Sequence, residues 1–136
     1  MLPSLLDTDI LSEMLKQRHA RVVAHAAKYL TDQGQFALSA LTRYEIVRGM
    51  RDRNASAQLQ KFESFCQQSV VLPITDAILM RAADLWVIAR RNGHPKSDAD
   101  LIIAATALEH GRNLVTGNAA HFNWIDGLVL EDWRKA

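Results

Sequence analysis

Three acidic residues that lie far apart in the sequence, Asp7, Glu45 and Asp100, are the strongest candidates for chemistry. Asp7 directly follows the apolar pair Leu5-Leu6, which ends a short predicted strand. Glu45 lies in the first turns of a predicted helix, and Asp100 lies at the start of another. Carboxylates that meet in a folded protein repel one another, and a hard divalent cation with oxygen ligands relieves that repulsion. The residue types therefore predict a site for Mg²⁺ or Mn²⁺.

The elements that would position these acids alternate along the chain. Apolar runs predict strands at residues 5–6, 36–39, 70–72, 113–116 and 128–130. Helical periodicity predicts helices at residues 8–16, 19–30, 42–50, 59–65, 77–90 and 98–110. This alternation predicts an α/β fold, a three-layer α/β/α sandwich with a central, mostly parallel sheet of four to five strands. The length suits one domain over residues 1–136.

Parallel strands are expected to bring the acids to one rim of the sheet. Ligand sites in open α/β sheets form beyond the carboxyl ends of the strands. Asp7 follows the first strand, Glu45 belongs to the helix after the second, and the helix near Asp100 runs back against the strands. Thr116 and Asn118 follow the fourth strand. All of these residues are therefore expected on the same rim.

Each acid also has a simpler explanation, as part of a helix cap. Asp7 suits the cap of the helix that begins at Thr8. The segments Thr42–Glu45 and Ser97–Asp100 both have the form of a capping box. Capping does not require that the capped ends share one rim, so the joint arrangement favours a functional site.

Basic residues gather in two stretches near the acids, although the net charge is only +1. Four arginines lie between Arg43 and Arg53, and residues 90–96 contain three basic residues without an acid. Such stretches are typical of a solvated helix face, and two of them near an acidic centre also suit contact with a phosphate backbone. The candidates for that contact are Arg43, Arg48, Arg90, Arg91 and Lys96.

Several other classes of protein fit the sequence poorly. The histidines and the single cysteine, Cys66, lack zinc-site spacing, and no glycine-rich phosphate loop follows a strand. Neither a signal peptide nor a membrane-spanning run is apparent, so we expect a cytoplasmic protein. The apolar residues of segment 77–90, Trp86 included, are expected to lie in the core.

Four segments together resemble the motifs of PIN-domain proteins. They are Leu6–Glu13, Leu41–Gly49, Asp98–Ala107 and Val115–Phe122. Their order and spacing, and the length of the chain, resemble most closely the VapC group, the toxins of bacterial toxin–antitoxin pairs. The resemblance implies a Mg²⁺- or Mn²⁺-dependent endoribonuclease that cuts structured RNA, such as tRNA or ribosomal RNA loops. It also implies a homodimer and a VapB-like antitoxin that covers the site.

The resemblance also implies roles for individual residues. Asp7 and Asp100 correspond to metal ligands and Glu45 to a ligand that acts directly or through water, with Asp98 as a further candidate. Thr8, Thr116 and Asn118 are expected to support them. The fourth motif of the family often offers acids where this chain has Asn118 and His121. Whether one or two ions bind is therefore left open.

Two other functions would also account for acids in a small α/β domain. A non-enzymatic RNA-binding module of the same fold would keep the acids for stability only. A receiver-type signalling domain would need an aspartate after the third strand and a lysine after the fifth. Pro73 and Glu131 stand at those places, so the receiver pattern fits poorly.

Overall fold

Short strands and longer helices alternate in the computed structural model, which describes residues 3–93 and 96–135. The strands in this part of the chain are β1 (Ser4–Leu6), β2 (Ala37–Ser39), β3 (Val70–Leu72), β4 (Asn113–Val115) and β5 (Leu130–Glu131). The helices there are α1 (Thr8–Lys16), α2 (Ala20–Gln33), α3 (Ala40–Asp52), α4 (Ser56–Gln67), α5 (Asp76–Arg91) and α6 (Asp98–Glu109). A short 3₁₀ turn, η1 (Ala119–His121), follows β4. The predicted α/β alternation is confirmed.

The strands form a parallel sheet whose hydrogen bonding is divided in two. β4 pairs in parallel with both β1 and β5, and β2 pairs in parallel with β3. β1 and β2 lie in contact and join the two parts, which gives the spatial order β3-β2-β1-β4-β5. Because all pairs are parallel, the carboxyl ends of the strands meet at one rim.

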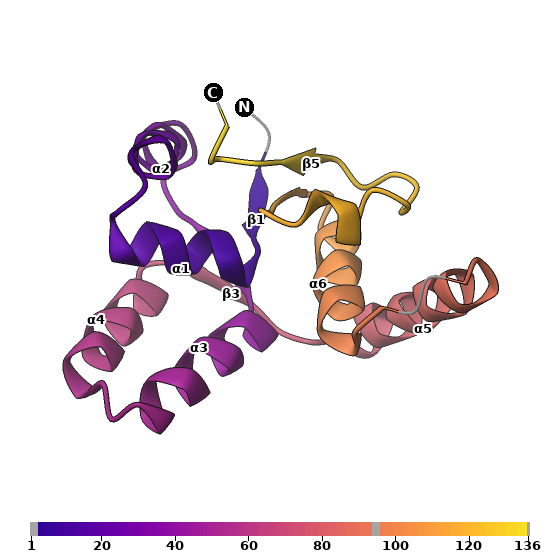
Figure 1. The fold of residues 1–136 in the computed structure, drawn as a ribbon, viewed down its shortest axis with the longest axis horizontal. Coiled ribbons are helices and arrows are strands. Elements are labelled where there is room, and N and C mark those ends of the chain that lie inside the picture. The colour runs from indigo at the N-terminus through magenta and orange to yellow at the C-terminus, as the bar shows by residue number, and fades with distance from the viewer. Residues whose placement is uncertain (1–2, 94–95, 136) are drawn as a thin grey trace.

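Helices cover both faces of this sheet, and the side chains of each strand alternate between two cores. Leu5 and Leu114 pack with α5 and α6, whereas their neighbours Leu6 and Val115 pack with α1 to α4. Figure 1 shows α1 to α4 gathered on one side of the strands and α5 and α6 on the other. The predicted three-layer α/β/α sandwich follows from this division.

Helix ends confirm two of the predicted caps and correct the third. Asp7 caps α1 through its side chain, and the Ser97 hydroxyl accepts a hydrogen bond from the Asp100 amide. The expected capping box of Thr42 and Glu45 is wrong, because α3 begins at Ala40 and Ser39 caps it. Glu45 is therefore free of any capping role.

The expectation that Trp86 lies in the core is also wrong. Only Ile78, Ala82, Leu85 and Ala89 of α5 are buried. These residues form a narrow stripe against α6, and Trp86 lies outside it with 45% of its surface exposed. Helical periodicity predicted this helix correctly, but it did not show that only a small part of its apolar surface is covered by other elements. Within the described residues, no helix combines the length and apolarity needed to cross a bilayer.

Candidate active site

Asp7 occupies the point where β1 meets the rim of the sheet. Its backbone amide donates to the carbonyl of Val115 at 2.9 Å, which ties the end of β1 to β4. Its carboxylate accepts from the Thr8 amide at 2.8 Å through Oδ1 and from the Thr116 hydroxyl at 2.8 Å through Oδ2. Only 5% of Asp7 is exposed. The strand end and two hydrogen bonds therefore fix both carboxylate oxygens.

The surroundings of Asp7 disfavour its negative charge. Burial raises its pKa from 3.8 to about 6, and the neighbouring charges of Asp9 and Asp100 act in the same direction. The hydrogen bonds from Thr116 and Thr8 oppose the rise only in part. Perturbed carboxylates of this kind concentrate at functional sites, and a cation held beside them would favour the ionised form.

Glu45 lies on the same rim and is linked to Asp7 through Thr8. The Thr8 hydroxyl donates to Glu45 Oε1 at 2.9 Å, and the Thr42 hydroxyl lies 3.1 Å from the Thr8 hydroxyl. Because the Thr8 amide donates to Asp7, this single residue contacts two of the three predicted acids. The Glu45 carboxylate is also 4.0 Å from Nη2 of Arg48 on the next turn of α3.

Asp100 approaches this group from the first turn of α6. Its charge contributes, as the smallest of the causes, to the raised pKa of Asp7, so the two acids interact electrostatically across the rim. Its Oδ2 lies 3.2 Å from Nδ1 of His121 in the turn after β4. The sequence assigned His121 no role, because only the fold brings η1 beside α6.

The loop after β4 is held by Asp9, which lies in the first turn of α1. Asp9 Oδ2 accepts from the Gly117 amide at 2.9 Å and from the Asn118 side-chain amide at 3.0 Å. The Asn118 backbone amide donates to the Thr116 hydroxyl at 3.0 Å. Asn118 therefore braces the loop that positions Thr116. The spacing of Asp7 and Asp9 was the available signal, since both flank the start of α1.

The remaining predicted residues lie farther from this network. Asp98 is exposed on α6 and lines a hollow beside Trp86. Arg43 contacts Cys66 and Arg90 stacks on Trp86, so neither is drawn toward the acids. Arg91 is exposed and Lys96 is half-buried. Of the five basic candidates, the structure brings Arg48 alone into contact with a predicted acid.

The acids fit a cation site of modest size. Across residues 3–93 and 96–135, no three His, Cys, Asp or Glu side chains converge closely enough to form a ready-made metal cluster. Mg²⁺ commonly binds through one or two carboxylates and keeps several waters. Asp7 and Asp100, whose charges interact, would fit that pattern, and the Thr8 hydrogen bonds hold Glu45 on the same rim.

A groove leads away from the acids between α1, α3 and α4. It has a volume of about 510 Å³ and begins at Thr8 and Glu45. Apolar side chains and four cationic side chains line it: Leu15, Ile46, Met50 and Phe62, with Lys16, Arg18, Arg53 and Lys61. The groove therefore joins the acidic site to a surface of opposite charge.

The geometry defines the class of protein. It is a three-layer α/β/α sandwich with a parallel sheet, and its acids lie at the carboxyl ends of the strands. The family model of the PIN domain matches residues 4–127, and the chain belongs to that family. A solved toxin–antitoxin complex from Klebsiella pneumoniae contains a similar chain, with a TM-score of 0.72 and 26% identity. The match covers 93% of this chain and 95% of that one.

Similar sequences place the chain in the VapC group of the PIN domain family. It is 28% identical over 134 residues to the tRNA(fMet)-specific endonuclease VapC of Shigella flexneri, covering 98% of this chain and 99% of that protein. It is 31% identical over 127 residues to ribonuclease VapC10 of Mycobacterium tuberculosis, covering 91% and 89% of the two chains.

Proposed function

We propose that this chain is a metal-dependent endoribonuclease and the toxin of a VapBC-type toxin–antitoxin pair. The observation that carries the proposal is the Asp7 carboxylate, which is buried, is fixed by Thr8 and Thr116, and has a pKa raised mainly by that burial. A buried carboxylate with a raised pKa suits a metal ligand better than a structural cap. The names of the relatives support RNA as the substrate.

The position of each residue at the site indicates its role. Asp7 and Asp100 would hold Mg²⁺ or Mn²⁺, which when bound polarises the scissile phosphate and lowers the pKa of a coordinated water. Glu45, held by the Thr8 hydroxyl, would orient a water for attack on the phosphate. Thr116 keeps Asp7 in place, and Asn118 supports Thr116 through its backbone amide.

Structured RNA with exposed loops is the proposed substrate class, as in tRNA or ribosomal RNA. Unpaired loops expose their bases and leave the backbone open to in-line attack. The name of the Shigella flexneri relative gives a tRNA as its target. Arg48 lies beside Glu45 and is the cation best placed to contact a phosphate next to the scissile bond. The cytoplasm, where these RNAs are found, is the proposed compartment.

A VapB-like antitoxin is the proposed partner, supported by the similar chain in the Klebsiella pneumoniae complex. The groove that starts at Thr8 and Glu45 suits an acidic, amphipathic segment of such a partner, because cations line its apolar floor. Replacing Arg53 and Lys61 by Glu should weaken neutralisation. Unchanged neutralisation would remove the groove from the antitoxin interface.

The enzymatic proposal is tested by cleavage of RNA in Mg²⁺ with and without EDTA. The wild-type protein and the variants Asp7→Asn and Asp100→Asn are compared with Asp32→Asn, which changes an exposed acid at the end of α2. We expect cleavage by the wild type and the Asp32 variant, and losses of at least about a hundredfold in the other two. Equal cleavage by all four proteins, or cleavage that ignores EDTA, contradicts the proposal.

The same preparations separate the enzyme from an RNA-binding module. Binding of RNA without cleavage by the wild type, in the presence of Mg²⁺ or Mn²⁺, would favour the non-enzymatic module. Sequencing of fresh RNA ends after brief expression identifies the RNA and the bond that is cut.

A further inference from the structure

Tyr44 is exposed beside the candidate active site, on the turn of α3 that also carries Glu45. More than half of its surface, 57%, is open to solvent, whereas Tyr29, the other tyrosine of the chain, is buried at 1%. Aromatic side chains usually contribute to stability by being buried, because they carry a large apolar area. A ring left outside the core next to a candidate site for RNA is therefore a candidate for contact with the substrate.

Arg48 fixes the Tyr44 ring and links it to the acids. The two residues are four apart on α3 and share one face of the helix. Cζ of Arg48 lies 5.0 Å from the Tyr44 ring centroid, and its Nη2 lies 4.0 Å from Oε2 of Glu45. A guanidinium over an aromatic ring is attracted to it and holds the ring in place. This pair, here called the Tyr44–Arg48 platform, therefore continues the line of side chains that runs from Asp7 through Thr8 to Glu45.

A hollow at the platform provides room for a nucleotide. It has a volume of about 440 Å³ and is bordered by Tyr44, Val47, Arg48, Arg51 and Asp52. This lining combines an aromatic ring, an apolar side chain and two cations against one acid, which suits a base together with its neighbouring phosphates. The hollow shares no lining residue with the groove between α1, α3 and α4. RNA bound here would therefore leave that groove to the antitoxin.

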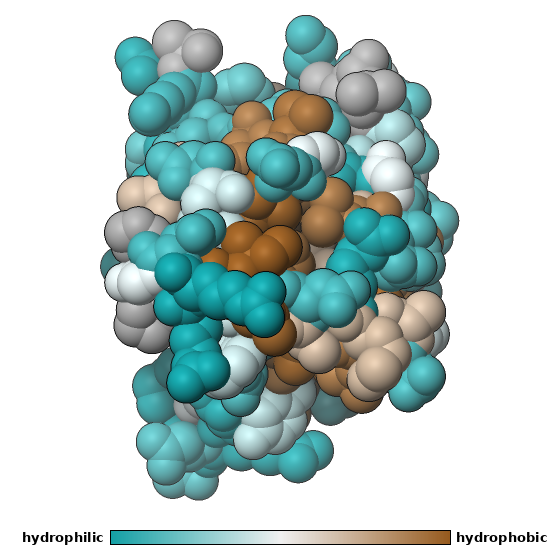
Figure 2. All heavy atoms as spheres, turned by 90° about the vertical axis from the view of Figure 1, so that its right-hand side faces the viewer, coloured by the Kyte–Doolittle hydropathy of each residue, from teal (hydrophilic) through white to brown (hydrophobic). Residues whose placement is uncertain are grey.

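The described residues contain a second arginine–aromatic pair, in different surroundings. Arg90 lies over Trp86, with Cζ 5.6 Å from the ring centroid. That pair belongs to α5, which lies on the side of the molecule that faces the viewer in Figure 2. Hydrophobic side chains run through the middle of this face, and hydrophilic side chains surround them. Such an apolar surface suits contact with a protein better than contact with a phosphate backbone.

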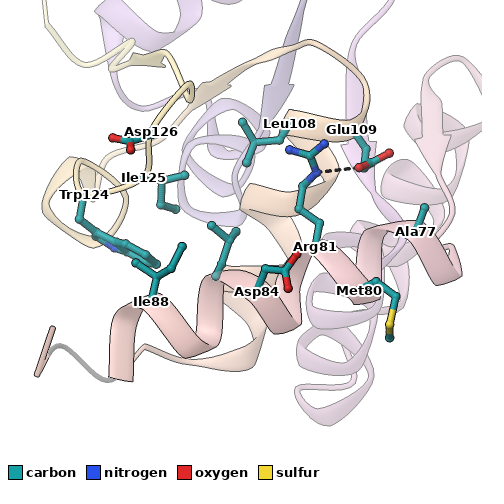
Figure 3. A pocket seen from close by; sticks show the side chains of 11 residues that line it. Ala77, Met80, Arg81, Asp84, Ile88, Leu108, Glu109, Trp124, Ile125 and Asp126 are labelled. Atoms are coloured by element: carbon teal, nitrogen blue, oxygen red, sulfur yellow. Dashed lines mark hydrogen bonds and ion pairs between the residues drawn. The ribbon is translucent and has the colours of Figure 1, made fainter. Parts of the chain in front are cut away.

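The pocket beside α5 is also unsuited to RNA (Figure 3). It contains an aromatic side chain, Trp124, but three acids line it: Asp84, Glu109 and Asp126. Arg81, a cation of this pocket, is already engaged, because its Nε donates to Glu109 Oε1 at 2.6 Å. An excess of negative charge repels a phosphate backbone. The platform, in contrast, combines an exposed ring with cations and lies next to the acids of the candidate active site.

We infer that the Tyr44–Arg48 platform binds an unpaired base of the RNA, next to the phosphate held at the acids. The base stacks on the Tyr44 ring, and Arg48 keeps the ring in place while it faces the neighbouring phosphate. The inference rests on the proposed nuclease function and gives it a physical reason to select loops. A base within a duplex is stacked on its neighbours, whereas an unpaired base can lie flat on a side chain. Because every base has a π face, the platform selects unpaired nucleotides without selecting a sequence.

The first experiment measures RNA binding by fluorescence anisotropy in an inactive parent protein, Asp7→Asn. The probe is a fluorescein-labelled RNA hairpin that copies the anticodon arm of a tRNA, titrated over a range of salt concentrations. Tyr44→Leu keeps an apolar side chain without an aromatic face and should raise the dissociation constant by roughly tenfold, whereas Tyr44→Phe should stay within about twofold of the parent. The slope of log affinity against log salt should stay unchanged in both variants, because stacking releases no counterions.

Val129→Ala is the matched control on a distant surface. Val129 is 55% exposed, much like Tyr44, and directly precedes β5. β5 forms the edge of the sheet that lies away from β2, the strand that leads into α3. This variant should therefore bind the hairpin as tightly as the parent does. Circular dichroism of each variant shows that it is folded.

The second experiment tests whether Tyr44 and a base of the RNA contact each other. Loop nucleotides of the hairpin are replaced one at a time by abasic nucleotides, and each RNA is titrated with the parent protein and with Tyr44→Leu. At one loop position the missing base should weaken binding to the parent by roughly tenfold, yet weaken binding to Tyr44→Leu by less than about twofold. The reason is that removing either the ring or the base abolishes the same stacking interaction.

Three results would each overturn the inference: equal affinities of Tyr44→Leu and the parent for the hairpin, the same abasic losses in both proteins, or no binding of the hairpin. Weaker neutralisation of Tyr44→Leu by the antitoxin, with RNA binding intact, would assign the platform to that protein partner instead. Because the binding assays involve no turnover, their failure leaves the nuclease proposal to the cleavage assay.

Discussion

Asp7→Asn should make the protein more stable at neutral pH while it destroys activity. Burial and the neighbouring acids raise the pKa of Asp7 to about 6, from 3.8. A difference of roughly two pKa units corresponds to about 3 kcal/mol of free energy between the protonated and ionised forms. The substitution removes this cost of ionisation from the folded state. It also loses one well-matched hydrogen bond to Thr8 or Thr116, which lowers the free energy of unfolding by about 1 kcal/mol. The expected net stabilisation is therefore about 2 kcal/mol at pH 8.

The pH dependence follows from the direction of the shift. The folded protein binds the Asp7 proton more tightly than the unfolded chain does, because its folded pKa is the higher one. The stability gained from this difference is fully present below pH 3.8 and is lost as the pH rises through about 6. The Asn side chain does not titrate. The advantage of the variant should therefore be full at pH 8 and disappear near pH 4.

Urea unfolding of both proteins in EDTA, at pH 8, 6 and 4.5, measures this difference. Adding Mg²⁺ at pH 8 should raise the stability of the wild type and leave Asp7→Asn unchanged, since bound ligands stabilise the state that binds them. A variant that is less stable than the wild type at every pH would refute the assigned environment of Asp7.

Three further substitutions test the residues around the acids. Thr116→Val removes a hydrogen bond that lowers the pKa of Asp7, so the pH profile of kcat/KM should move to higher pH with a loss of roughly tenfold. The matched variant Thr106→Val, in the middle of α6, should leave the profile in place, and equal profiles for both variants would contradict this role of Thr116. Gly117→Ala would bring a Cβ within 2.6 Å of the Arg134 guanidinium and of the Asp9 carboxylate. The free energy of unfolding, measured by thermal unfolding, should fall by about 1–3 kcal/mol. An unchanged melting temperature would contradict the close packing. Arg48→Ala should reduce the slope of log affinity for RNA against log salt by about one in an inactive variant, and an unchanged slope would exclude a phosphate contact.

The order of the elements could be predicted from the sequence because local rules govern it. Short apolar runs bounded by turns predicted each strand near its observed place, and parallel pairing then carried Asp7, Glu45 and Asp100 to one rim. Ser97 was predicted as a helix cap from its local motif and is confirmed. These features depend on residues within a few positions of one another, which a sequence displays directly.

Contacts between distant segments were not accessible in the same way. The link from Thr8 to Glu45, and the contact of His121 with Asp100, join residues that only the assembled sheet brings together. The true start of α3 at Ala40 was missed because Thr42 and Glu45 imitate a capping box one turn later. Trp86 was misplaced because periodicity marks an apolar face without showing whether a neighbour covers it.

Titration calorimetry with Mn²⁺ at pH 7.5 measures binding of a metal ion at Asp7 and Asp100 without RNA or turnover. We expect saturable binding by the wild type and by Asp32→Asn, and loss of that binding in Asp7→Asn and in Asp100→Asn. Binding of equal affinity by all four proteins, or no binding by any of them, would contradict this expectation.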